Sequence, residues 1–166
     1  TTLKMSIIKM MDRLKPKSIV VVSSAPQIRY PDCYGIDMAK LEGLVAFRAA
    51  LELLKERNLY HIVDEVYVKC KKQEDLHDKD VVNFVTEIYA PFKPQEISDK
   101  IAELLSSPEI NAEVKIIFQT VENLHIACPK NLGDWYFTGD YPTPGGNRVV
   151  NKAFMNFYEG KDARAY

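Results

Sequence analysis

The chain has 166 residues, of which 46% are hydrophobic and 27% are charged, and its formal net charge is −1. This length suits one domain that buries about 70% of its unfolded surface, as in an ordinary soluble globular protein. A charge near zero excludes a general attraction to nucleic acid or to an anionic membrane, and no apolar run approaches the roughly 20 residues of a membrane span. Three scattered cysteines favour reduced thiols and a cytoplasmic location.

The N-terminal part of the chain predicts a helix followed by a buried strand. Apolar residues recur at helical spacing over residues 3–14, and Pro16 ends the pattern. We expect the methionines of this helix to fill space in the core. Residues 17–24 predict a strand, and their uninterrupted apolar run is typical of a parallel strand that is buried on both faces.

The segment SSAPQIRYPDCYGIDM, residues 23–38, overlaps the end of this strand and continues as a loop. It combines prolines, an arginine, tyrosines, a glycine and acidic residues, which is more polar and stiffening chemistry than a plain connection needs. In an open α/β sheet, ligands bind at the carboxyl ends of the strands. The sequence therefore predicts that this loop forms the edge of a functional site.

Helices dominate the rest of the chain. Helical periodicity is predicted for residues 39–58, 60–73, 81–89, 95–105 and 147–158. The mixed-charge segment 69–80 is interpreted as a solvated helix end and loop. A second strand at residues 114–118 leads into a short helix that Thr120 caps and Pro129 ends, and residues 133–146 form an aromatic, turn-rich loop.

These elements predict an α/β fold with a partial parallel sheet. Two parallel strands do not make a self-sufficient sheet. Further strands are therefore either hidden in the middle segment or lie outside this sequence, and we expect the second, with the missing part before Thr1 in a longer protein. Such a piece has an open sheet edge, and we expect it to form a homo-oligomer through that edge.

Three motifs occur in an order that points to one family. They are YGIDM at residues 34–38, IFQTVENL at 117–124 and FTGDYPT at 137–143. The first is the most specific when it is read with the preceding SSAPQIRYPDC, whereas the second is weak alone. The chain resembles the C-terminal part of the glutamine phosphoribosylpyrophosphate amidotransferases over most of its length. Residues 50–93 have no counterpart in shorter members and are interpreted as a helical insertion.

The resemblance implies both a fold and a reaction. It implies a type I phosphoribosyltransferase sheet in an enzyme whose N-terminal glutaminase domain releases ammonia from glutamine. With magnesium present, the ammonia displaces pyrophosphate from phosphoribosyl pyrophosphate and gives phosphoribosylamine in the first step of purine nucleotide synthesis. The glutaminase domain and the carboxylates of the phosphate loop would precede Thr1, so we expect the isolated chain to be inactive.

The same resemblance assigns candidate site residues. Thr1 and Thr2 match the end of the family's phosphate-binding loop, at the N-terminus of the first helix, where free N–H groups favour an anion. No residue is assigned a catalytic role. A possible wall of the site is formed by Ser24, Arg29, Tyr34, Gly35 and Asp37.

Several of these residues also have a purely structural interpretation. Asp37 either approaches the metal–pyrophosphate side of the site or caps the helix that follows, and capping is the favoured role. Arg29 either contacts phosphate or ribose or pairs with a local carboxylate, and Gly35 supplies a backbone conformation that suits glycine. His77, close to three aspartates, is interpreted as part of a solvated charge cluster rather than a metal site. The aromatic rings of residues 133–146 are interpreted as loop anchors rather than nucleotide-stacking groups.

Some relatives bind an iron–sulfur cluster through a CxxC pair before the FTG triplet. Gly133 and Tyr136 occupy these positions here, so no cluster is predicted. The expected partners are phosphoribosyl pyrophosphate and glutamine, not nucleic acid or membrane. Two alternatives stay open, a nucleobase phosphoribosyltransferase and a non-catalytic interaction module that works through the helical insertion.

Overall fold

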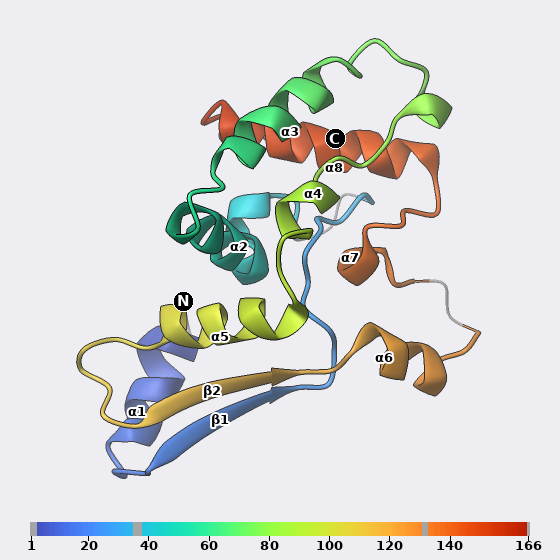
Figure 1. Cartoon of the computed structure of the whole chain (residues 1–166). Helices are drawn as coiled ribbons and strands as arrows, with labels where there is room; N and C mark the ends of the chain where they lie inside the picture. The colour runs from blue at the N-terminus through green and yellow to red at the C-terminus, as the bar shows by residue number, and fades with distance from the viewer. Residues whose placement is uncertain (1–2, 35–37, 131–132, 166) are drawn as a thin grey trace.

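The computed structural model describes residues 3–34, 38–130 and 133–165. It is helix-rich and contains a small parallel sheet of two strands, which agrees with an α/β fold at this coarse level. In Figure 1 the strands form the lowest layer, α5 (Pro94–Leu105) runs above them, and a lobe of helices lies above α5.

The sheet consists of β1 (Ser18–Ser23) and β2 (Glu113–Phe118), which run parallel. Both segments are rich in β-branched residues, which favour strands because their side chains pack well on a pleated surface. The pairing ends with Ser23 opposite Phe118. Both strands therefore end at the same edge of the sheet, and the loops that follow them start side by side.

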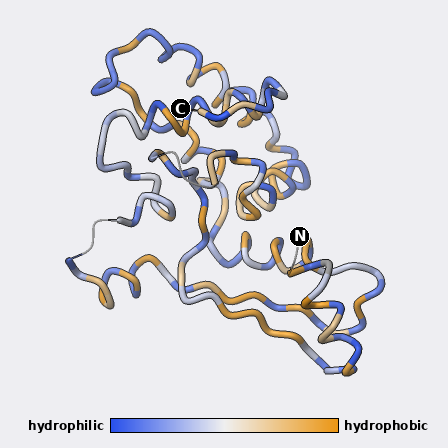
Figure 2. The backbone as a smooth tube through the Cα atoms, turned by 180° about the vertical axis from the view of Figure 1, so that it is seen from behind, coloured by the Kyte–Doolittle hydropathy of each residue, from blue (hydrophilic) through white to orange (hydrophobic). Residues whose placement is uncertain are grey.

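Described helices cover only one face of the sheet. Ile19 and Ile116 are buried beneath them, but Val20, Val22 and Ile117 lie on the opposite face and are exposed, Val22 to 70%. The prediction that the first strand is buried on both faces is therefore wrong for the described chain, because its helices lie on one side of the sheet (Figure 1). Figure 2 shows that hydrophobic residues run along both strands.

The N-terminal helix packs on the covered face. It begins as the π-helical segment η1 (Leu3–Ile8) and continues as α1 (Lys9–Asp12). Ile8 is fully buried in a small cluster with Ile19 of β1 and Ala112, the residue before β2, whereas Met10 and Met11 are 60% and 41% exposed. The prediction that Met10 and Met11 fill the core is wrong, because the helix turns Ile8 toward the sheet instead. The same prediction for Met5 concerns a side chain outside the described residues.

The helix α5 forms the crossover between the two parallel strands. Its N-terminus has proline in the first turn and one half of a capping box, in which the Lys93 N–H donates to Glu96 Oε2 at 2.7 Å. Ile97 and Ile101 are almost completely buried in the main core. The predicted helix 95–105 is thus confirmed, with one additional residue at its start.

The long segment between β1 and α5 folds into a helical lobe together with the C-terminal helix. Its rings Phe47 and Phe154 are fully buried and meet edge to face, with centroids 6.3 Å apart. The predicted insertion at 50–93 is largely helical and belongs to this lobe. The elements of the lobe are η2 (Leu41–Gly43), α2 (Val45–Glu56), α3 (His61–Lys71), η3 (Asp78–Asp80), α4 (Thr86–Tyr89) and α8 (Pro144–Tyr158).

Several helix boundaries in the lobe differ from the prediction. The helix predicted over residues 39–58 is shorter: the backbone is extended at Lys40 and Leu44 on either side of η2, so α2 begins only at Val45 and ends at Glu56. Residues 81–85 are not helical, because the Gln73 side chain forms hydrogen bonds with both backbone groups of Val82. Gln73 Nε2 donates to the Val82 carbonyl at 3.0 Å, and the Val82 N–H donates to Gln73 Oε1 at 2.8 Å. The last helix begins at Pro144 rather than at residue 147, since a proline fits the first turn of a helix.

Candidate functional site

A pocket of about 420 Å³ lies at the carboxyl ends of the two strands, and we refer to it as the carboxyl-end pocket. This is where open α/β sheets bind their ligands. Its walls come from the loop after β1, the first turns of α5, the end of β2, α6 (Val121–Ala127) and α7 (Trp135–Thr138). The lining residues are Pro26, Gln27, Arg29, Tyr30, Pro94, Gln95, Ser98, Ile117, Phe118, Gln119, Thr120, Val121, Glu122, Phe137 and Thr138.

Arg29 is the cation among these lining residues. Its Nε and Nη2 atoms donate to Gln27 Oε1 at 3.2 and 2.8 Å, and its Cζ lies 5.3 Å from the centroid of the Tyr89 ring. The described partner of this guanidinium is therefore an amide and a ring face rather than a carboxylate. A guanidinium held in this way is suited to bind phosphate or carboxylate oxygens.

Gln27 orients Arg29 and is itself fixed by α5. It is only 5% exposed, and its Nε2 donates to the Pro94 carbonyl and to Ser98 Oγ, both at 2.8 Å. Sequence reasoning assigned no role to Gln27 or Ser98. Gln27 belongs to the specific segment after the first strand and could have been found there. Ser98 follows it by 71 residues and carries no local signal.

Hydrogen bonds hold the aromatic loop, residues 133–146, against the loop after β1. The Tyr136 carbonyl accepts from the Arg29 N–H at 2.8 Å, while its hydroxyl donates to Asp32 Oδ1 at 2.8 Å. The Tyr141 hydroxyl donates to the Pro31 carbonyl at 2.7 Å. The prediction that these rings anchor the loop is confirmed for both tyrosines, and they hold the backbone of Arg29 in place.

The tyrosines near the pocket are neutral hydrogen-bonding groups at physiological pH. Burial raises the pKa of Tyr30 to about 12, and its ring meets Tyr89 edge to face at 5.4 Å. Burial and the hydrogen bond to Asp32 raise the pKa of Tyr136 to about 12. Because desolvation disfavours the phenolate, both hydroxyls stay protonated. Tyr30 forms part of the pocket wall, and Tyr136 donates its hydrogen bond to Asp32. The pocket offers one cation, Arg29, one carboxylate, Glu122, and amides, hydroxyls and apolar surface. Arg29 is the group among them that is suited to bind an anion.

The short helix after β2 forms one side of the pocket. Thr120 Oγ1 accepts from the Asn123 N–H at 3.1 Å, so the predicted cap is confirmed. His125 Nε2 lies 2.8 Å from Asp134 Oδ2 and joins this helix to the residue before α7. These contacts place Thr120 and Thr138 at the same pocket.

Of the residues predicted for the site, the structure brings Arg29 into the pocket. Ser24 is exposed and is not among its lining residues. Tyr34 is 59% exposed and packs against Trp135 outside the pocket, with ring centroids 5.8 Å apart. The remaining candidates, Thr1, Thr2, Gly35 and Asp37, lie outside the described residues.

The described residues hold no group of three His, Cys, Asp or Glu side chains that could bind a metal ion. The magnesium that the resemblance implies stays a prediction. His77 is exposed, and its Nδ1 accepts from the Lys79 N–H at 3.4 Å, in keeping with a solvated cluster. The lack of an iron–sulfur cluster stays a prediction.

In the part of the chain that the structure describes, each helix is too short or too polar to cross a membrane. Comparison with known proteins found no matching family model, no matching curated protein and no matching solved structure.

Proposed function

We propose that this chain is the C-terminal part of the phosphoribosyltransferase domain of an amidophosphoribosyltransferase. Such an enzyme makes phosphoribosylamine from phosphoribosyl pyrophosphate and glutamine. One observation supports this proposal most directly. Residues from the segment 23–38, from the motif 117–124 and from the motif 137–143 are far apart in sequence but line one pocket at the carboxyl ends of parallel strands.

In this proposal the chain binds and positions the sugar phosphate. The Arg29 guanidinium contacts a phosphate oxygen, and Gln27 together with the Tyr89 ring holds the guanidinium in the orientation that this contact needs. A cation that is already oriented stabilises negative charge without reorganisation, and charge develops on pyrophosphate as it departs. Arg29 is thus a binding residue, and Gln27 is a positioning residue.

The test is an assay of pyrophosphate release from phosphoribosyl pyrophosphate by the protein as its gene encodes it. Glutamine, ammonia and adenine are compared as acceptors. We expect release with glutamine and with ammonia. Release with adenine alone would select a nucleobase phosphoribosyltransferase, and no release with any acceptor would leave the interaction module as the better description.

Variants of Arg29 connect the assay to this pocket. Arg29→Ala removes a charge-assisted contact, so kcat/KM for phosphoribosyl pyrophosphate should fall about tenfold or more, and Arg29→Lys should recover part of the loss. Arg48→Ala is the matched control, because Arg48 is exposed on α2 and does not line the pocket. Equal effects of Arg29→Ala and Arg48→Ala would contradict the role of Arg29.

A further inference from the structure

A second pocket lies in the helical lobe, away from the carboxyl-end pocket. It has a volume of about 260 Å³ and is formed by the end of α3, the segment after η3, α8 and the C-terminal tail. We refer to it as the α3–α8 pocket. Its deepest residues, Cys70, Val81 and Met155, are buried to within a few per cent of their surface. The floor of this pocket is therefore apolar.

The polar side chains near the floor already have hydrogen-bond partners within the protein. Gln73 uses both ends of its amide on the backbone of Val82. Asn151 Nδ2 donates to the Val82 carbonyl at 2.8 Å, while its Oδ1 accepts from the Phe84 N–H at 3.3 Å. The interior of the pocket consequently offers apolar contacts to a ligand and few hydrogen bonds.

The mouth of the pocket is charged, and its cations differ in how they are paired. Two cations, Arg148 and Lys152, and one carboxylate, Glu74, line it, which leaves a net charge of +1. Arg148 is committed to the protein, because it donates to Asp78 and to the carbonyls of Glu74 and Leu76. Arg148 therefore stabilises the turn after α3 rather than binding a ligand in the pocket.

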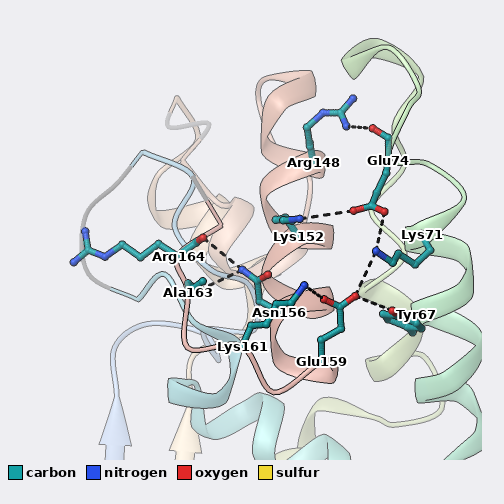
Figure 3. Close-up of polar contacts among 10 residues, drawn as sticks. All are labelled: Tyr67, Lys71, Glu74, Arg148, Lys152, Asn156, Glu159, Lys161, Ala163 and Arg164. Atoms are coloured by element: carbon teal, nitrogen blue, oxygen red, sulfur yellow. Dashed lines mark hydrogen bonds and ion pairs between the residues drawn. The ribbon is translucent and has the colours of Figure 1, made fainter.

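Lys152 is the cation that is free to meet a ligand. Its Nζ lies 3.7 Å from Glu74 Oε1, too far for a hydrogen bond, and it donates none to the described residues. Glu74 is held more closely by Lys71, at 2.9 Å. Figure 3 shows Lys152 on α8 facing Glu74, with Lys71 on the far side of the same carboxylate.

The lysines around this mouth outnumber the carboxylates with which they pair. Lys71 also reaches Glu159 at 3.4 Å, and Lys161 pairs with the same carboxylate (Figure 3). Three lysines thus meet two carboxylates, Glu74 and Glu159, which leaves one positive charge in excess. An apolar floor beneath a mouth with excess positive charge suits one kind of ligand.

We propose that the α3–α8 pocket binds a small amphipathic anion, with its apolar part on Cys70, Val81 and Met155 and its anionic group at Lys152. Small-molecule sites commonly combine apolar walls with a few polar groups that fix orientation. A cavity of about 150 Å³ is known to admit a benzene-sized group, so this pocket has room for a ring. The proposal does not depend on the function proposed for the carboxyl-end pocket.

The experiment is a titration of the full chain with phenyl phosphate, followed by isothermal calorimetry and by backbone amide chemical shifts. Phenol and inorganic phosphate test each half of the probe separately. We expect saturable one-site binding of phenyl phosphate, with shifts centred on residues 70–74, 81 and 148–155, and weaker binding of either half. Shifts centred on the carboxyl-end pocket, or no saturable binding, would overturn the proposal.

A pair of charge-removing variants distinguishes a site from general attraction. Lys152→Gln should weaken phenyl phosphate binding about fivefold, as expected for a half-exposed charge pair. Lys72→Gln removes the same charge at the end of α3, from an exposed residue that does not line the pocket, and should change the affinity less than twofold. Equal weakening by both variants would show that the anion is attracted without a site.

Discussion

At the scale of single residues, Gly139 connects the candidate site to the helical lobe. It ends α7 with a φ of +82°, in the left-handed region that favours glycine. A Cβ at this position would lie 2.8 Å from Asn83 Nδ2 and 2.9 Å from Tyr30 Cζ. Asn83 Nδ2 donates to the Gly139 carbonyl at 3.1 Å. The close approach of these three residues holds the aromatic loop against both the pocket and the lobe.

Replacing Gly139 should therefore cost more than backbone strain alone. We expect Gly139→Ala to lower the free energy of unfolding by about 2 kcal/mol or more, because it adds a clash to an unfavourable φ. Gly160→Ala is the control, since Gly160 has a φ of +66° but open space around the added Cβ, and it should cost about 1 kcal/mol. Urea unfolding measures both, and equal losses would contradict the contribution of the clash.

At the scale of elements, a single carboxylate attaches the N-terminal helix to the start of β2. Asp12 closes α1, and its Oδ1 accepts from the N–H groups of Asn111 and Ala112 at 3.0 and 2.8 Å. Asn111 Nδ2 adds a third hydrogen bond at 3.2 Å. The Ala112 N–H contributes most to lowering the pKa of this carboxyl below its usual value. Helix and strand are joined through the ionised form of Asp12.

The stability contributed by Asp12 should depend on pH in one direction. Because its pKa is lower in the folded chain, its contribution is fully present above its unfolded pKa of about 4 and is lost as pH falls through the folded value. We expect Asp12→Asn to be less stable than the unchanged chain at pH 7, and the difference to shrink toward pH 3. Urea unfolding across this range checks it, and a difference that is constant with pH would contradict the role of the charge.

At the scale of the whole molecule, the uncovered sheet face is the largest departure from a closed α/β domain. Val20, Val22 and Ile117 are exposed on that face, and Figure 2 shows the apolar strands at one end of the molecule. Within the described residues β1 pairs with β2 alone, and β1 contains no charged residue or proline that would discourage pairing with a further strand.

We therefore expect the chain to self-associate through this part of the sheet. Val22→Lys should shift the chain toward monomer, because a lysine on an open strand discourages pairing with another chain. Val68→Lys is the control, since Val68 is 49% exposed but lies on α3 in the helical lobe. Sedimentation velocity over a range of protein concentrations makes the comparison. A monomer at all concentrations, or an equal effect of both variants, would contradict self-association through the sheet.

The candidate site shows which kind of information a single sequence carries. Arg29 could be predicted, because the residue types around it and its place after a buried strand are local features. Gln27 and Ser98 could not be paired in advance, because their contact joins residues 71 positions apart. The bond from Tyr136 to Asp32 spans 104 positions and depends on how the two loops meet. Distant partners of this kind follow from packing and leave no periodic signal.

The sequence by itself determined both strands, the helix of residues 95–105, the Thr120 cap and the polar loop after the first strand. Each depends on hydrophobic periodicity or on a side chain that bonds within a few residues. Only the tertiary structure decided which face of the sheet is covered, why residues 81–85 leave the helical pattern, and which loop residues share a pocket. These features depend on contacts between segments that are distant in sequence. Such contacts form, and contribute to stability, only when the whole chain has packed.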